Sequence, residues 1–188
     1  SEAVRRSGRA ALGPVFGEAK NHADFTGIAA ALLPADGGGA EPFWMLAART
    51  LFVETCIKLI KDGQATNQAL ASRLMMADLK EVHKMLENTV ADPLTAPEAA
   101  KMAESIRAVF NTNAQALRFL PEGKEPFSIQ TWIRNDDKPG SILFITSSHN
   151  ELVLNRALLS LWMNLAVHTL MRLPRTRFAY ALPADAPA

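Results

Sequence analysis

A row of polar side chains recurs at helical spacing in the second half of the chain. At steps of four, four and three residues, the row consists of Arg107, Asn111, Gln115 and Arg118. This spacing places two guanidinium groups and two amides on one helix face, opposite an apolar stripe. Such a face could follow a phosphate backbone or contact a protein partner. A solvated helix face has the same pattern, because an amphipathic helix needs a polar side.

Two further cations, Lys58 and Lys61, lie close to the expected end of another helix. They could contact a nucleic acid or a partner. Cations near a helix C-terminus are also stabilising without any ligand. Lys80 and Lys84 form a second basic pair, but nearby glutamates dilute their charge. We rank this second pair lower as a contact site.

No arrangement of nucleophile, base and orienting group occurs along the chain, so we expect no catalytic residue and no enzyme activity from this chain alone. The glycine run 37–39 continues without the lysine of a phosphate-binding loop. The histidines are scattered, and Cys56 has no second cysteine or metal-ligand spacing. We therefore expect no metal and no cofactor for this chain, and a buried, reduced thiol at Cys56.

The composition is that of a folded chain with one substantial core. The sequence has 188 residues, of which 48% are hydrophobic and 21% charged, and its formal net charge is +1. A near-neutral chain supplies no global field for a polyanion, so a nucleic acid would have to meet a local cluster of cations. The free thiol and the absence of a signal-peptide pattern favour the cytoplasm.

The elements that must position these side chains are mostly helical. Apolar residues at helical spacing predict helices over 24–33, 42–61, 68–75, 78–86 and 96–119, and a short helix over 129–133. Asp78 and Ser128 are candidate N-caps, and Thr95 with Glu98 has the spacing of a capping box. Arg49 lies on the inner side of its helix, where it should pair with an acid or a carbonyl.

After Gly140 the sequence pattern changes. The run 142–146 predicts a strand, and 178–182 would begin another. The segment 152–171 is apolar nearly all round, as expected for a helix between a sheet and another layer. Its ionisable residues argue against a membrane span. The hydroxyl cluster after the first strand, consisting of Thr146, Ser147 and Ser148, could sense a nucleotide phosphate or cap the following helix.

Several short sequence words stand in order along most of the chain. They include Glu41-Pro42-Phe43-Trp44, Ala48-Arg49-Thr50-Leu51-Phe52, Ser105-Ile106-Arg107-Ala108-Val109, and Pro126-Phe127-Ser128-Ile129 with Trp132. These words resemble the TraD-like coupling ATPases of bacterial type IV secretion and conjugation. In that family an all-alpha domain is inserted into a RecA-like nucleotide-binding domain. The resemblance implies a mainly α fold, a helical bundle followed by a small α/β portion that returns to the nucleotide-binding domain.

The implied domain organisation has four parts. They are a lead-in segment 1–21, an all-alpha domain 22–125, partial nucleotide-binding-domain elements 126–182 and a disordered tail 183–188. The family expects a strand ending in Asp-Glu after Arg177, whereas this chain has only a displaced Asp185. ATP hydrolysis by this chain alone is therefore not expected.

The resemblance also implies a role in a larger assembly. The longer protein would use ATP and Mg, form a homohexamer and lie at the cytoplasmic face of the bacterial inner membrane, while this chain alone would be a monomer. The chain would be a substrate-facing module that guides single-stranded DNA or the relaxase complex to the channel. The alternative is a docking domain for relaxosome or secretion-channel proteins without direct DNA binding. In either case the rest of its own ATPase is a partner.

Overall fold

The fold consists of helices in three layers. The computed structural model describes residues 15–34, 42–120, 127–134 and 142–173, and within these ranges it contains helices and no strand. The α-helices are α1 (His22–Leu32), α2 (Pro42–Lys61), α3 (Asn67–Met75), α4 (Leu79–Leu86), α5 (Asp92–Thr95), α6 (Ala100–Asn113), α7 (Ile129–Arg134) and α8 (Leu152–Met171). The 3₁₀ helices are η1 (Pro97–Ala99), η2 (Gln115–Phe119) and η3 (His149–Glu151). The expectation of a mainly α fold is confirmed.

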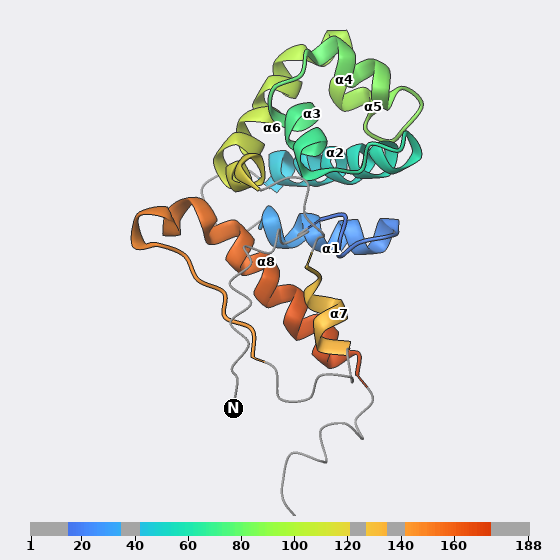
Figure 1. Ribbon diagram of the computed structural model, residues 1–188. Helices are drawn as coiled ribbons and strands as arrows, with labels where there is room; N and C mark the ends of the chain where they lie inside the picture. Colours follow the sequence, from blue (N-terminus) through green and yellow to red (C-terminus); the bar gives the residue numbers. More distant parts are fainter. Residues whose placement is uncertain (1–14, 35–41, 121–126, 135–141, 174–188) are drawn as a thin grey trace, which may run out of the picture.

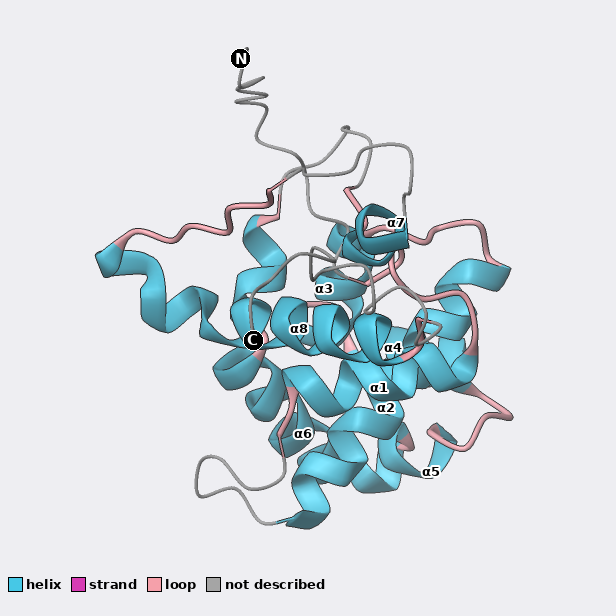
Figure 2. Cartoon of the chain, turned by 90° about the horizontal axis from the view of Figure 1, so that it is seen from below, coloured by secondary structure: helices cyan, strands magenta, loops and turns pink. Residues whose placement is uncertain are grey.

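Helix α1 is the middle layer. It contacts α2 and α8, and Figure 1 shows it between the group α2–α6 and the pair α7 and α8. In the view from below, the described part of the chain is drawn as helices joined by loops (Figure 2). Residues Phe25, Ile28 and Leu32 recur at helical spacing and are buried. One core therefore runs through all three layers, from Leu70 in α3 to Leu161 in α8.

The end of α1 is tied to α2 by a side chain. The Nε–H of Arg49 donates a hydrogen bond of 2.8 Å to the carbonyl of Leu33, the residue that follows α1. This satisfies one of the carbonyls that a helix end leaves without a partner. The prediction that Arg49 pairs within the fold is confirmed, and the partner is a carbonyl.

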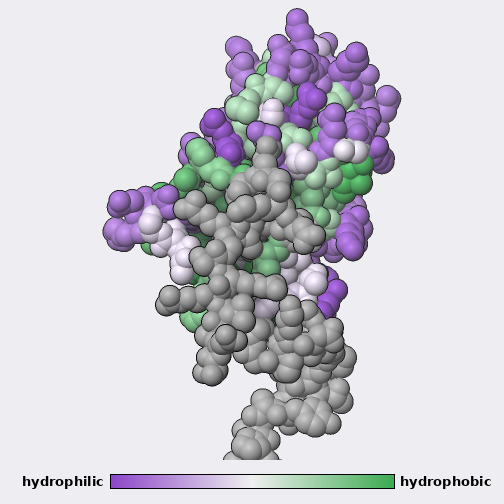
Figure 3. All heavy atoms as spheres, viewed as in Figure 1, coloured by the Kyte–Doolittle hydropathy of each residue, from purple (hydrophilic) through white to green (hydrophobic). Residues whose placement is uncertain are grey.

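Helices α2, α3 and α4 lie where the sequence pattern predicts them. Gly63 follows α2 with a φ of 68°, a conformation that glycine adopts at little cost. Asp78 caps α4 by accepting a hydrogen bond of 2.7 Å from the backbone N–H of Lys80, as predicted. Hydrophilic side chains gather at the end of the molecule formed by α4 and α5 (Figure 3).

The single helix predicted over 96–119 is wrong. The structure has η1, α6 and η2 in its place. The predicted capping box is also wrong, because Thr95 is buried at the end of α5 and its hydroxyl donates to the carbonyl of Asp92 at 3.2 Å. Helix α6 begins at Ala100 without a side-chain cap.

The break after Asn113 goes with a local hydrogen bond and with the burial of the residues that follow. The side-chain amide of Asn113 donates to the carbonyl of Val109 at 2.9 Å, and such a bond competes with the backbone ladder. The chain then tightens into η2, which buries the neighbours Ala116 and Leu117 together with Ala114. A straight α-helix would not bury two adjacent residues and Ala114 equally well.

The predicted strand 142–146 is not formed. Residues 142–148 have no regular secondary structure. Their side chains alternate as in a strand: Leu143 and Ile145 pack against the core, whereas Ile142 and Phe144 are 75% and 80% exposed. A strand needs a neighbour for its backbone N–H and C=O groups, and the described part of the chain offers none. The second predicted strand, 178–182, lies outside the described residues.

Helix α8 has the predicted bounds but not the predicted burial. Leu158, Leu161 and Trp162 face the core, while Val153 and Met171 are 88% and 77% exposed. The helix is covered on one side only, because the described residues supply no sheet for its other side. Among the described helices, none is both long enough and apolar enough to cross a membrane.

The last part of the lead-in segment is packed into the fold. The carboxylate of Glu18, only 7% exposed, accepts hydrogen bonds from the backbone N–H groups of Ile129 and Gln130 and from the hydroxyl of Ser128. Ser128 in turn caps α7 by accepting from the N–H of Thr131 at 3.0 Å, as predicted. A buried carboxylate therefore satisfies the start of α7.

Candidate nucleic-acid interface

Arg107 is hydrogen-bonded within the fold. Its Nη2 donates a hydrogen bond of 2.6 Å to the carbonyl of Ala77, in the turn between α3 and α4. The side chain is half-buried. A guanidinium with one edge on a carbonyl has fewer donors left for a phosphate. Arg107 therefore joins α6 to the α3–α4 hairpin through this hydrogen bond, and its contact with a nucleic acid or a partner stays a prediction.

The other three residues of the row are exposed, but they are divided between two elements. Asn111 lies in the last turn of α6, whereas Gln115 and Arg118 lie in η2. Because the backbone changes from α to 3₁₀ geometry at Ala114, their spacing no longer defines one straight face. The structure thus places a compact polar group at the α6–η2 junction, in place of a long stripe.

Arg118 lies against an exposed aromatic ring. Its guanidinium carbon is 5.9 Å from the centroid of the Phe119 ring, within the range of a cation–π contact. Phe119 is 64% exposed. Arg118 forms no ion pair with any residue that the structure describes. The junction therefore presents, side by side, a flat apolar ring and a cation that has no acid partner among the described residues.

The two lysines at the end of α2 differ in their surroundings. The Nζ of Lys58 is 3.8 Å from the carboxylate of Asp62, one turn further along. Lys61, in the last turn of α2, is exposed. An exposed i,i+4 pair contributes a few tenths of a kcal/mol, about 0.3 to 0.5. Lys58 is thus partly neutralised, and Lys61 remains available to an anion.

The hydroxyl cluster lies just before α8. Ser147 accepts a hydrogen bond of 3.0 Å from the side-chain amide of Asn155, and the hydroxyl of Ser148 donates to Glu151 at 2.9 Å. Thr146 is exposed. The two serines therefore contact α8 and η3, respectively, and Thr146 is exposed to solvent.

A groove of about 390 Å³ lies between α1, α7 and α8. Its polar lining includes the carboxylates of Glu18 and Asp24 as well as His168 and Arg172. Carboxylates repel phosphates. This groove is therefore a poorer site for a nucleic acid than the α6–η2 junction.

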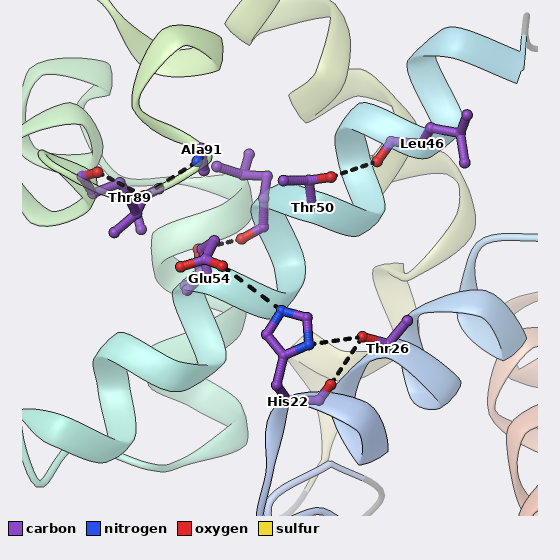
Figure 4. Close-up of polar contacts among 10 residues, drawn as sticks. His22, Thr26, Leu46, Thr50, Glu54, Thr89 and Ala91 are labelled. Atoms are coloured by element: carbon purple, nitrogen blue, oxygen red, sulfur yellow. Dashed lines mark hydrogen bonds and ion pairs between the residues drawn. The ribbon is translucent and has the colours of Figure 1, made fainter.

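Two of the histidines, His22 and His83, have local side-chain partners. Figure 4 shows His22 between two helices, with Nε2 3.9 Å from the carboxylate of Glu54 in α2 and Nδ1 3.4 Å from the hydroxyl of Thr26 in α1. His83 lies 3.5 Å from the carboxylate of Asp92. No group of three potential metal ligands occurs among the residues with a described placement.

Sequence reasoning missed two features. The Arg118–Phe119 contact was not anticipated, although a basic residue beside an aromatic one at an expected helix end is a usable signal. The role of Glu18 was not anticipated either, since its partners follow it by 110 to 112 residues. Pairings over such distances leave no trace in local spacing.

Comparison with known proteins gives a family and several relatives. The family described as the type IV secretion-system coupling protein DNA-binding domain matches residues 7–179. The coupling protein TraD of Escherichia coli (strain K12) is 28% identical over 174 residues, which cover 90% of this chain and 24% of TraD. The chain thus spans about a quarter of that relative.

The solved structures of coupling proteins are similar in fold. The bacterial conjugative coupling protein TrwBdeltaN70, unbound and in a monoclinic form, matches with a TM-score of 0.74 and 26% identity over 87% of this chain and 40% of that chain. The plasmid coupling protein TrwB in complex with ADP and Mg²⁺ matches with a TM-score of 0.73 and 27% identity over 85% of this chain and 38% of that chain. The expected resemblance is confirmed.

Proposed function

Because the chain belongs to the family of type IV secretion-system coupling protein DNA-binding domains, we propose that it is the substrate-facing module of a hexameric coupling protein. In this role it contacts single-stranded DNA, or the relaxase complex that accompanies it, and guides that cargo to the secretion channel. The observation that carries the proposal is the match of the family over 7–179, with a description that names DNA binding.

The α6–η2 junction is the surface that we assign to this contact. Asn111, Gln115 and Arg118 are exposed there, and Arg118 is free of an acid partner among the described residues. Amides and a guanidinium are suitable donors for phosphate oxygens. With a net charge of +1 on the whole chain, a local contact of this kind supports DNA binding better than bulk attraction does.

The test is fluorescence anisotropy with a labelled single-stranded oligonucleotide at low and moderate salt. Each phosphate contact releases counterions, so the affinity should fall with salt, and Arg118→Ala should reduce the slope of log K against log salt by about 0.7. Lys84→Ala removes one exposed cation from α4 and is the matched control. Equal slopes for the two variants would exclude Arg118 as a phosphate contact.

The nucleotide chemistry of the longer protein is a separate proposal. The 188 residues contain no phosphate-binding Gly-Lys loop, so ATP and Mg would be held by the remainder of a longer ATPase at the cytoplasmic face of the inner membrane. Thr146, Ser147 and Ser148 would lie near that portion and report its nucleotide state. Their position just before η3 and α8 supports this assignment.

A second candidate function is docking to other protein portions. Helix α8 exposes Val153, Met163 and Met171, and the neighbouring segment exposes Ile142 and Phe144. Exposed apolar groups gathered along one helix and its approach favour a protein contact. The rest of the ATPase is the partner that we propose first, with secretion-channel or relaxosome proteins as alternatives.

The docking proposal is tested in two versions of the protein. Val153→Ser with Met171→Ser should leave the melting temperature of the 188-residue chain nearly unchanged, because both side chains are solvent-exposed there. In the longer protein the same pair should lower the melting temperature by several degrees. Val90→Ser, at a site 70% exposed in the α4–α5 turn, is the control. No difference between the two contexts would rule out docking through this face.

A further inference from the structure

We infer that Phe119 and Arg118 form a stacking platform for an unpaired base of single-stranded DNA. This inference rests on the proposed DNA-binding function and adds to it the kind of contact and the residues that make it. The phosphate contact assigned to Arg118 is an electrostatic interaction with the DNA backbone. The platform adds a stacking interaction between a base and the flat faces of the ring and of the guanidinium.

The first observation is the position of Phe119. It is the last residue of η2, and in the same turn Ala116 and Leu117 are only 3% and 1% exposed. The chain therefore buries two neighbours and leaves the largest side chain of the turn 64% exposed. Water disfavours a bare aromatic ring, so an exposed phenylalanine at a proposed ligand surface is a candidate contact.

The second observation is the cation beside this ring. The guanidinium of Arg118 lies 5.9 Å from the ring centroid and makes no ion pair or hydrogen bond with any described residue. A guanidinium without an acid partner keeps its charge for a ligand. It is planar and stacks on aromatic faces, including those of bases.

The exposed ring and the neighbouring cation together indicate which kind of ligand fits this surface. An apolar protein partner would bury the ring but would leave an unpaired cation at the contact, which is unfavourable. An unpaired nucleotide offers a π-face to the ring and a phosphate to the guanidinium in one unit. Duplex DNA keeps its bases stacked on each other, so the platform favours single strands.

A second exposed aromatic serves as the internal comparison. Phe43, in the first turn of α2, is 53% exposed and makes an edge contact with Trp44, with ring centroids 5.1 Å apart. No cation lies over Phe43 among the described contacts. The two phenylalanines thus have similar exposure, and they differ in the partner that lies beside the ring.

The experiment uses the 188-residue chain and two labelled probes of equal length, a thymidine oligonucleotide and its abasic counterpart. Phe119→Ala and Phe119→Leu should weaken binding of the thymidine probe by about 5- to 150-fold, the range measured for loss of one stacked base. Both should leave the abasic probe unaffected. Phe119→Trp should restore binding, and Phe43→Ala should have no effect on either probe. Circular dichroism melts check that each variant is folded.

The outcomes separate this inference from the proposed function. If the intact chain binds the thymidine probe and Phe119→Leu binds it equally well, the platform is wrong while DNA binding stands. If Phe119→Leu weakens the abasic probe as much as the thymidine probe, the effect does not come from base stacking and the platform is again wrong. Failure of the intact chain to bind either probe at low salt overturns both proposals.

Discussion

At the residue scale, Arg107 shows how a side chain placed by spacing on a ligand-facing row can belong to the fold. Its hydrogen bond to the carbonyl of Ala77 joins residues 30 positions apart. Arg107→Ala should lower the free energy of unfolding in urea by about 1.5 to 3 kcal/mol, because a charge-assisted bond to a half-buried carbonyl is lost. Lys101→Ala, an exposed change on the same helix, should cost less than about 0.5 kcal/mol.

Arg107→Ala and Arg118→Ala together test whether the two arginines differ in their contribution to DNA binding. DNA affinity measured under native conditions should be unchanged in Arg107→Ala and reduced in Arg118→Ala. If folded Arg107→Ala loses as much DNA affinity as Arg118→Ala, Arg107 is part of the contact surface.

Cys56 gives a prediction with a defined pH dependence. Burial raises the pKa of its thiol well above the ordinary value of 9.0, since desolvation penalises the thiolate. The free energy by which the neutral, buried thiol favours the folded state is fully present below pH 9.0. It is lost as the pH rises from 9.0 toward the raised pKa of the thiol in the folded state. The unfolding free energy of the natural chain should therefore fall more steeply above pH 9 than that of Cys56→Ala, measured by urea unfolding at a series of pH values.

Two arginines show what spacing could and could not predict. Arg49 was correctly predicted to pair within the fold, because its helical phase places it on the inner side of α2 and a buried guanidinium needs a partner. The pairing of Arg107 within the fold was not predicted, because its helical phase places Arg107 on the polar face of α6. The position of the Ala77 carbonyl depends on how α3 and α4 pack, which the sequence near Arg107 does not contain.

At the element scale, α8 offers a comparison between its two sides. Leu161 is 1% exposed, and Val167 is 49% exposed on the other side of the helix. Leu161→Ala should destabilise the chain by about 2 to 5 kcal/mol through lost burial and a residual cavity. Val167→Ala should change stability by less than about 1 kcal/mol. Thermal and urea unfolding measure both, and similar losses would mean that α8 is covered all round.

Elements with local signals were predicted well, and elements that need a distant partner were not. The cap at Asp78 depends on the next two residues, and the sequence shows them. The strand expected over 142–146 depends on a neighbouring strand, which the described residues lack. The break of the long helix at Ala114 depends on the burial of Ala116 and Leu117 by α3 and α8. Tertiary contacts override local helix propensity there.

At the scale of the whole molecule, Glu18 links two segments that are far apart in the sequence. Its carboxylate joins the segment before α1 to the start of α7. Glu18→Ala should lower the free energy of unfolding by about 2 to 4 kcal/mol, because it leaves the N–H groups of Ile129 and Gln130 without their acceptor in a buried place. Glu104→Ala, exposed on α6, is the matched control. Equal stability of the two variants would show that water replaces the carboxylate.

The middle position of α1 has a consequence for synthesis on the ribosome. Helix α1 meets α2 shortly after it is made, but its other side waits for α8, which begins at Leu152, 120 residues after α1 ends at Leu32. At bacterial elongation rates that interval lasts on the order of ten seconds. During this time Gly27, Ile28 and Ala31, which later line the groove between α1 and α8, face the cytosol of the producing cell. A nascent chain stalled before Leu152 should therefore be a client of chaperones that hold apolar helices, and release of the stall should end that association.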